Sequence, residues 1–227
     1  MKKSIATQYN TFHTMYSENT FQDEKSNASF YSQIDFVLEG KKLLDIGCGD
    51  GADLKFFAEQ RAVIHGIDPS ADFISKAKVI NPTGILVEAK GENIPFSDNT
   101  FDIAVSKWAL QTSPNIPRIM REIARVLKPG GILLFLSKHP WMQQMEKIRD
   151  FGNDADYYER KVVTSNIFSG KIVLKEPSHT IGEYFNKEFY SNFEVLDYQE
   201  GTDFPASEQL NGMVYPTFFV VKARRKK

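Results

Sequence analysis

From residue 41 onward, the apolar residues alternate between short runs and stretches with helical spacing. Short apolar runs are typical of strands buried on both faces, and the stretches between them predict helices that cover those faces. The alternation therefore predicts an α/β fold around a mostly parallel sheet. We expect strands at residues 42–46, 62–67, 85–88, 101–106 and 132–137, and helices at residues 52–60, 71–80 and 116–127.

The regular alternation stops after Pro140. Residues 141–178 are rich in aromatic and polar side chains, which predicts an insertion that serves as a lid or binding loop, with a hairpin within residues 162–174. Beyond the insertion we expect one helix and two strands, near residues 181–190, 193–198 and 217–221.

The composition is that of an ordinary globular chain, with 41% hydrophobic residues, 25% charged residues and a net charge of -1. A charge near zero provides no field that attracts nucleic acid, so we do not expect nucleic acid as a partner. The longest aliphatic run, residues 132–136, is too short to span a bilayer, and the first residues turn polar too soon for a signal peptide. The single cysteine, Cys48, fits the reducing cytoplasm that we expect as the location.

Three glycines follow the first predicted strand in the segment Asp45-Ile46-Gly47-Cys48-Gly49-Asp50-Gly51. Glycines at this spacing let the backbone turn tightly and approach a ligand before the next helix begins. Asp68 ends the second predicted strand 21 residues after Gly47, where this architecture places a carboxylate that binds ribose hydroxyls. The two features together predict a nucleoside site.

The spacing of Gly47, Gly49 and Ala52 also matches the dinucleotide pattern G-x-G-x-x-A, so spacing alone leaves a nicotinamide cofactor open. Asp45 argues against it, because a carboxylate at this loop repels a pyrophosphate. The same carboxylate attracts an ammonium or sulfonium group. The charge therefore favours S-adenosylmethionine (SAM).

Four blocks of the sequence together resemble small-molecule class I SAM-dependent methyltransferases, in particular the group that includes the enzymes of ubiquinone and menaquinone biosynthesis. The blocks are residues 43–51, 66–70, 94–102 and 127–131. The resemblance is strong over residues 40–140 and looser toward the end of the chain. It implies a Rossmann-like, doubly wound sheet of seven strands, mostly parallel with an antiparallel last strand, and helices on both faces.

The resemblance also implies the cofactor residues. Asp45 and the glycine loop would hold the methionine portion, Asp68 with Pro69 the ribose, and Glu92 and Asn93 the adenine. Lys107 and Trp108 would lie beside the cofactor after the fourth strand. The residues so assigned to the cofactor are Asp45, Gly47, Cys48, Gly49, Gly51, Asp68, Pro69, Glu92, Asn93 and Lys107.

Lys90 departs from the family, because relatives usually carry at this position an aspartate that accepts the adenine amino hydrogen. A lysine side chain has donors and no acceptor. We therefore expect adenine to be recognised by backbone groups or by Glu92.

The candidate residues for the methyl-acceptor pocket are predicted from their positions relative to the expected strands. His139 follows the fifth strand, on the edge where ligands bind in this architecture, and is our candidate general base. Trp141, Tyr157 and Tyr158 of the insertion are candidate aromatic walls, and His179 is a further candidate for the pocket. No metal site is expected.

These segments suit one methyltransferase domain over residues 1–227. It would comprise an N-terminal helical cap (1–40), a cofactor-binding core (41–140), the insertion (141–178) and a C-terminal helix with strands (179–227). The expected reaction is methyl transfer to an oxygen, nitrogen or carbon nucleophile of a small molecule, with release of S-adenosylhomocysteine (SAH). A nicotinamide-dependent oxidoreductase and a catalytically silent partner protein of the same fold remain alternatives, and the sequence leaves the oligomeric state open.

Overall fold

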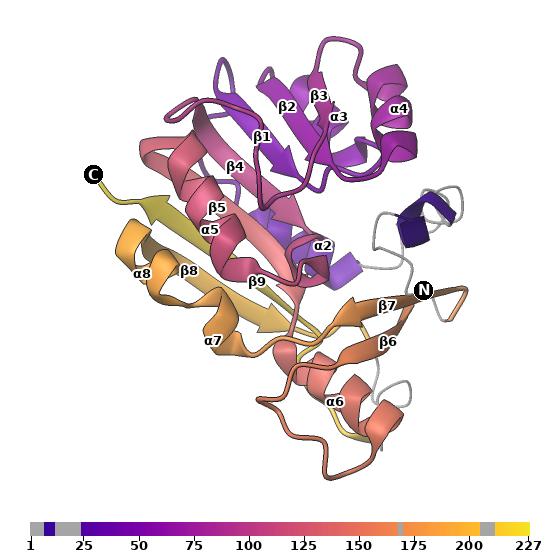
Figure 1. Cartoon of the computed structure of the whole chain (residues 1–227). Coiled ribbons are helices and arrows are strands. Elements are labelled where there is room, and N and C mark those ends of the chain that lie inside the picture. The colour runs from indigo at the N-terminus through magenta and orange to yellow at the C-terminus, as the bar shows by residue number, and fades with distance from the viewer. Residues whose placement is uncertain (1–6, 12–23, 168–169, 205–211) are drawn as a thin grey trace.

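The centre of the molecule is a sheet, and the computed structural model describes residues 7–11, 24–167, 170–204 and 212–227 of the chain (Figure 1). The strands of this sheet are β1 (Lys42–Ile46), β2 (Val63–Asp68), β3 (Ile85–Glu88), β4 (Phe101–Lys107), β5 (Leu127–Lys138), β8 (Phe193–Gly201) and β9 (Phe218–Arg225). Within the described residues, the seven strands lie in the order β3-β2-β1-β4-β5-β9-β8. The first five strands along the chain run parallel, as the alternating pattern predicts.

The last strand, β9, runs antiparallel to both neighbouring strands. Phe218 at its start lies opposite Lys138 at the end of β5 and opposite Gly201 at the end of β8. The antiparallel last strand implied by the resemblance is therefore confirmed, and with it the Rossmann-like sheet.

Helices cover both faces of the sheet, as expected. One face carries α2 (Glu24–Ser32), α3 (Ala52–Glu59) and α4 (Ala71–Ile80), and the other carries α5 (Ile116–Val126), α7 (Ile181–Tyr184) and α8 (Lys187–Asn192). On the first face, Phe30, Phe57 and Ile74 pack in one apolar cluster with side chains of the strands. On the second face, Ile123 and Phe189 belong to a separate cluster. The core is thus two apolar layers divided by the sheet.

The helix predicted at residues 116–127 is confirmed as α5. Asn115 caps it by accepting a hydrogen bond from the N–H of Arg118 at 3.1 Å. The following strand, β5, begins at Leu127, earlier than expected, because Leu127 pairs with Phe101 across an irregularity in the register. The sequence Pro129-Gly130-Gly131 therefore lies within β5 and does not separate it from the helix.

The insertion contains the predicted hairpin, β6 (Val162–Ile167) and β7 (Ile172–Pro177), which forms a separate antiparallel pair. It also contains a helix that the pattern does not indicate, α6 (Pro140–Phe151). The buried residues of α6 are largely polar or charged, among them Gln143, Glu146 and Lys147. A helix with a polar buried face has no apolar stripe, which explains why its sequence does not predict it.

Two expectations about the ends of the chain need adjustment. The helix predicted at residues 181–190 is two short helices, α7 and α8, because Asn186 interrupts the first and caps the second. In the predicted N-terminal cap, residues 7–11 and α2 are helical, whereas residues 1–6 and 12–23 of that cap lie outside the described residues.

Among the described helices, none combines the length and apolar character needed to cross a bilayer. No group of side chains suited to a metal ion occurs in the described ranges.

Candidate cofactor site

The glycine loop joins β1 to α3 beside the junction of β1 and β4, where the strand order reverses and where ligands bind in sheets of this type. Gly47, Gly49 and Gly51 have φ angles of 78°, 52° and 84°, in the left-handed region that favours glycine. A Cβ atom on Gly47 would lie 2.2 Å from the Cβ of Ala109, so close packing against the residues after β4 also requires glycine there. The loop thus brings its backbone to the carboxyl edge of the sheet.

Asp68, at the end of β2, connects this loop to the second strand. Its carboxylate accepts hydrogen bonds from the N–H of Gly49 at 3.1 Å and the N–H of Ser70 at 2.8 Å. Burial raises the pKa of Asp68 to about 6, against the lowering effect of these two donors. The predicted ribose acid therefore also holds the glycine loop in place.

Cys48 lies between two of the glycines and packs in the apolar cluster of the first face. Burial, followed by the nearby carboxylates of Asp45 and Asp68, raises the pKa of its thiol well above the usual value. A protonated, buried thiol behaves as a small apolar side chain. Cys48 is therefore part of the packing beneath the loop.

The side chain of Asp45 lies in an environment that is unusual for a carboxylate. The residue is 3% exposed, and no donor in the described part of the chain forms a hydrogen bond with its side chain. Burial raises its pKa well above the usual value, Asp53 and Asp68 add to the increase, and Lys107 opposes it. The neighbouring carboxylates Asp53 and Asp68 make a positive charge favourable at this position.

Lys107, at the end of β4, brings a positive charge to this region. Its ammonium group lies 2.7 Å from the carboxylate of Asp53 and donates to the side-chain oxygen of Asn27 at 3.1 Å. It also lies 5.3 Å from the ring centre of Tyr31, whose hydroxyl donates to Asp53. Lys107 therefore joins α2 and α3 to the sheet beneath the loop, and its charge is paired with Asp53.

A cavity of about 70 Å³ lies on the loop. It is lined by Tyr9, Gly47, Gly49, Asp68, Pro69, Phe73, Lys107, Trp108, Ala109 and Thr112. Of the predicted cofactor residues, Gly47, Gly49, Asp68, Pro69 and Lys107 line the cavity, whereas Asp45, Cys48, Gly51, Glu92 and Asn93 do not. Small-molecule sites typically measure about 300–1,000 Å³. Tyr9, from residues 7–11, forms one wall of this cavity, whose volume is below that range.

Residues 44–135, which include this loop, match the family model of the methyltransferase domain. The chain is therefore similar to methyltransferases over this segment. Its relatives include an uncharacterized methyltransferase of Synechocystis, 33% identical over 105 residues, which are 45% of this chain and 50% of that protein. The chain thus spans half the length of this relative, and smaller shares of a sterol 4-C-methyltransferase of Caenorhabditis elegans, at 30%, and a malonyl-[acyl-carrier protein] O-methyltransferase of Pectobacterium atrosepticum, at 38%.

A longer match covers more of the chain. The ubiquinone/menaquinone biosynthesis C-methyltransferase of Campylobacter jejuni is 28% identical over 183 residues, which are 72% of this chain and 75% of that protein. The similarity to this relative therefore extends beyond residues 44–135.

Solved structures show the same fold. A SAM-dependent methyltransferase of Mesorhizobium loti has a TM-score of 0.72 and 23% identity, over 90% of this chain and 100% of that chain. A second, from Methanosarcina mazei, has a TM-score of 0.63 and 21% identity, over 83% of this chain and 93% of that chain. SAM, the cofactor predicted from the sequence, is the methyl donor of this family.

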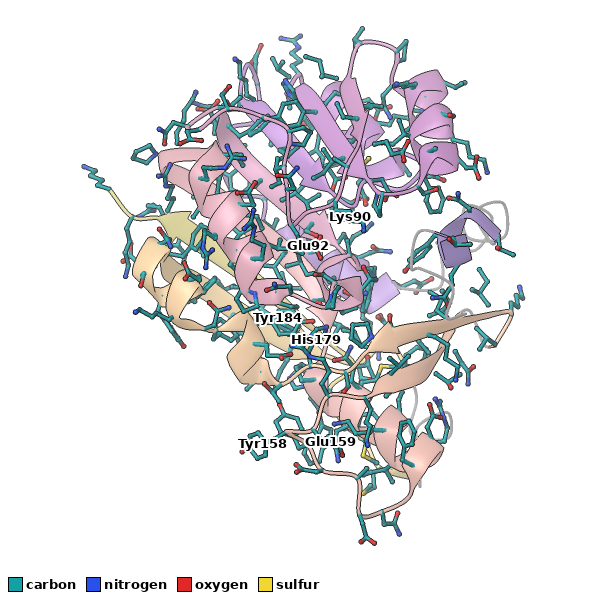
Figure 2. The ribbon with its side chains drawn as sticks, in the orientation of Figure 1. Lys90, Glu92, Tyr158, Glu159, His179 and Tyr184 are labelled. Atoms are coloured by element: carbon teal, nitrogen blue, oxygen red, sulfur yellow. The ribbon has the colours of Figure 1, made fainter. Side chains whose placement is uncertain are left out.

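The predicted adenine residues Glu92 and Asn93 follow β3 in the chain, and Figure 2 labels Glu92 on this segment. A side-chain oxygen of Glu92 accepts a hydrogen bond from the hydroxyl of Ser113, and the backbone carbonyl of Glu92 accepts one from Arg118 at 2.9 Å. The N–H of Asn93 donates to the carbonyl of Lys90 at 3.0 Å, which forms a turn. Neither Glu92 nor Asn93 lines the cavity on the glycine loop, and their adenine role stays a prediction.

His139 has two structural partners. Its Nδ1 accepts a hydrogen bond from the N–H of Trp141 at 3.0 Å and so caps α6, and its Nε2 lies 3.3 Å from the carboxylate of Glu200 on β8. Burial lowers the pKa of His139, although Glu200 opposes this. His139 does not line the cavity, so its role as a base stays a prediction while its cap is observed.

The four residues predicted to form the acceptor pocket are not brought together. Trp141 is 47% exposed and Tyr158 is 83% exposed, and the labelled side chain of Tyr158 lies apart from that of His179 in Figure 2. The hydroxyl of Tyr157 accepts a hydrogen bond from the N–H of Ile181 at 2.9 Å. His179 is buried, with Nδ1 2.6 Å from Glu183 and Nε2 3.1 Å from the carbonyl of Gln111.

The sequence does not predict the buried ionic cluster that forms around Lys138, at the end of β5. The ammonium group of Lys138 lies 3.1 Å from Glu146 of α6 and also contacts Glu176 and Ser165 of the hairpin. Burial raises the pKa of Glu146 to about 7, and Lys138 opposes the rise. The cluster joins the insertion to the sheet. A lysine at a strand end gives no sign of partners 8 and 38 residues away.

Proposed function

We propose that the protein is a SAM-dependent methyltransferase that acts on an oxygen, nitrogen or carbon nucleophile of a small molecule and releases SAH. The observation that supports this most is Asp45, whose carboxylate is buried beside the glycine loop without a hydrogen-bond donor among the described residues. Such a group is stabilised by a cation, and SAM carries two positive groups, the ammonium and the sulfonium. A pyrophosphate would meet repulsion at the same place.

The surrounding residues fit the remaining parts of the cofactor. Gly47 and Gly49 leave the backbone open to the methionine portion. The carboxylate of Asp68 has about four lone-pair sites. Two of them accept from Gly49 and Ser70, so the others remain for ribose hydroxyls. Glu92 and Asn93 would face the adenine. The fit therefore supports one complete nucleoside site.

When bound, SAM supplies a methyl group that is already activated by its sulfonium. The contribution of the chain is then to orient the two reactants and to exclude water, which alone can lower a barrier by about 7–11 kcal/mol in favourable cases. Tyr9, Phe73 and Trp108 are the apolar walls that would exclude water here. A base is needed only if the nucleophile must lose a proton, and His139 remains the candidate for that step.

The experiment that tests this proposal measures SAH release. The purified protein is incubated with SAM and a panel of phenolic, quinol, amine and carboxylate acceptors, and the Asp68→Ala variant serves as the control. Quinols come first, because the Campylobacter relative is named for ubiquinone and menaquinone biosynthesis. We expect acceptor-dependent SAH that Asp68→Ala reduces. Oxidation or reduction of a nicotinamide cofactor with any of these compounds would support the oxidoreductase instead, and binding of SAM without turnover would support the silent partner.

A further inference from the structure

One wall of the cavity on the glycine loop is formed by the segment that directly follows β4. Trp108, Ala109 and Thr112 of this segment line the cavity. The segment ends in a short 3-10 helix, η2 (Leu110–Thr112). Ala109 packs so closely on the loop that a Cβ atom on Gly47 would lie 2.2 Å from the Cβ of Ala109. A shift of this segment would therefore change both the cavity and the packing of the glycine loop.

The backbone of Trp108 is strained and needs support. Its φ angle of 56° lies in the left-handed region, which bulky residues rarely adopt and which persists only where the surrounding structure enforces it. The N–H of Trp108 donates to the carbonyl of Leu136 at 3.0 Å, and its carbonyl accepts from the side-chain amide of Gln111 at 2.7 Å. Gln111 is buried, and its side-chain oxygen accepts from the hydroxyl of Ser137 at 3.0 Å. The conformation of this wall therefore depends on Gln111.

His179 holds the backbone of Gln111 from the side of the insertion. Its Nε2 lies 3.1 Å from the backbone carbonyl of Gln111, and its Nδ1 lies 2.6 Å from the carboxylate of Glu183. The guanidinium of Arg160 also contacts Glu183, which favours the ionised carboxylate. Both partners of the ring are then acceptors, so the two hydrogen bonds together require a proton on each ring nitrogen. The side chain of His179 is fully buried, which fixes the ring between these partners.

The network around His179 reaches the cavity only through the segment after β4. His179 itself does not line the cavity. Its ring lies 5.9 Å from that of Tyr184, whose hydroxyl forms a hydrogen bond with Ser137 at 2.9 Å (Figure 2). Arg160 also donates to the carbonyl of Pro114, just beyond η2, at 2.7 Å. The insertion and the chain before α7 thus brace η2 from behind, while its front faces the cavity.

Building on the proposed function, we propose that His179 is a positioning residue of the SAM site: it holds the backbone of Gln111, and through it the wall formed by Trp108 and Ala109. This wall then keeps the distance from the glycine loop that SAM requires. The role differs from the contact with the methyl acceptor that the sequence suggests for His179. Loss of the hydrogen bond to Gln111 should weaken SAM binding by about tenfold, the scale of one hydrogen bond from a charged donor.

Two substitutions of His179 separate positioning from packing. The amide of His179→Gln extends to the place of Nε2 and can donate to the carbonyl of Gln111. The amide of His179→Asn reaches only the place of Nδ1, beside Glu183. Calorimetric titration with SAM should therefore show an affinity close to that of the wild type for His179→Gln and an affinity about tenfold weaker for His179→Asn.

The fluorescence of Trp108 reports on the wall without any ligand. The chain has two tryptophans, so Trp141→Phe leaves Trp108 as the only emitter. The indole N–H of Trp108 is buried and has no hydrogen-bonding partner within the described ranges. Displacement of the wall would expose this group to water and shift the emission to longer wavelength. We expect that shift when His179→Asn is added to Trp141→Phe, and no shift when His179→Gln is added.

Two further variants serve as controls. His65→Asn replaces another buried histidine, whose ring lies 5.0 Å from that of Phe101 and does not line the cavity, so it should change neither the emission nor SAM binding. Gln111→Met removes the amide that supports Trp108 and should give the same shift as His179→Asn, which keeps the test valid if His179→Asn does not fold.

Three outcomes would overturn the inference and leave the proposed function intact. One is unchanged emission and SAM affinity in His179→Asn, the second is unchanged emission in Gln111→Met, and the third is an equal loss of SAM affinity in His179→Asn and His179→Gln. Failure of the wild type to bind SAM would overturn the proposed function and the inference together.

Discussion

The carboxylate of Asp68 accepts a hydrogen bond from the backbone N–H of Gly49 at 3.1 Å, so the acid at the end of β2 supports the loop that follows β1. The shape of the glycine loop and the proposed contact with ribose would therefore depend on the same side chain. This relationship distinguishes Asp68 from a carboxylate that only touches the ligand.

Asp68→Ala should weaken SAM binding by at least roughly 2 kcal/mol, or about thirtyfold, because it removes charged acceptors for ribose and releases the loop. Asp68→Asn should lose less, since its amide oxygen can still accept one of the two backbone hydrogen bonds. The dissociation constants for SAM, measured by calorimetry, check both values. Equal affinity in the wild type and Asp68→Ala would remove this residue from the site.

Gly47→Ala should destabilise the protein by roughly 2–5 kcal/mol, because it adds a clash to an unfavourable positive φ. The new Cβ would lie 2.2 Å from that of Ala109, and the φ angle is 78°. Gly130→Ala is the matched control: its φ is 82° and nothing lies within 4 Å of the added atom, so it carries the strain without the clash. Urea unfolding should show that Ala109→Gly partly rescues Gly47→Ala. No rescue would mean that the clash is not the cause.

The local features of this site are predictable because they follow one another along the chain. Asp45, the three glycines and Asp68 lie at the ends of adjacent parallel strands, and strand order fixes their proximity. The pairing of Lys107 with Asp53 is not predictable in this way, because the partners are 54 residues apart and meet only after α3 packs on the sheet. The fold needs only the period of the apolar residues, whereas such a pair needs the packed structure.

The predicted residues for the methyl acceptor are less well determined by the sequence than those of the cofactor site. Position at the end of β5 correctly places His139 at the carboxyl edge, but α6 begins immediately afterwards and its first turn uses the imidazole as a cap. The sequence pattern does not predict α6, because the buried face of this helix is largely polar. A residue's strand position therefore predicts its edge of the sheet and leaves the direction of its side chain undetermined.

His139→Ala should cost about 1 kcal/mol of stability, the usual value of a helix N-cap, and His139→Asn should restore most of it. The cap requires a free Nδ1, and burial lowers the pKa of His139 in the folded state. The unfolded chain then binds more protons over this range, so stability is complete above the ordinary histidine pKa of about 6.5 and falls as the pH drops toward the lower folded value. Urea unfolding from pH 5 to 8 should show a steeper acid loss in the wild type than in His139→Asn. Identical pH profiles would contradict the assignment.

Lys138→Met should destabilise the protein by roughly 3–5 kcal/mol, because it leaves two buried carboxylates without their cation. The side chains of Lys138, Glu146 and Glu176 are 5%, 6% and 3% exposed. Adding Glu146→Gln and Glu176→Gln to Lys138→Met should recover much of the loss. The exposed pair Arg61–Glu39, with side chains 77% and 65% exposed, supplies the control: Arg61→Met should cost at most about 1 kcal/mol in the same unfolding experiment. Similar losses for the two methionine variants would show that burial of the Lys138 cluster has little energetic consequence.

The central claim is that the glycine loop and its two acids form a SAM site, and calorimetric titration of the purified protein with SAM and with NAD tests it most directly. We predict that SAM binds with one site per chain, that NAD does not bind, and that Asp68→Ala weakens the SAM isotherm. Binding of NAD without binding of SAM would contradict the account.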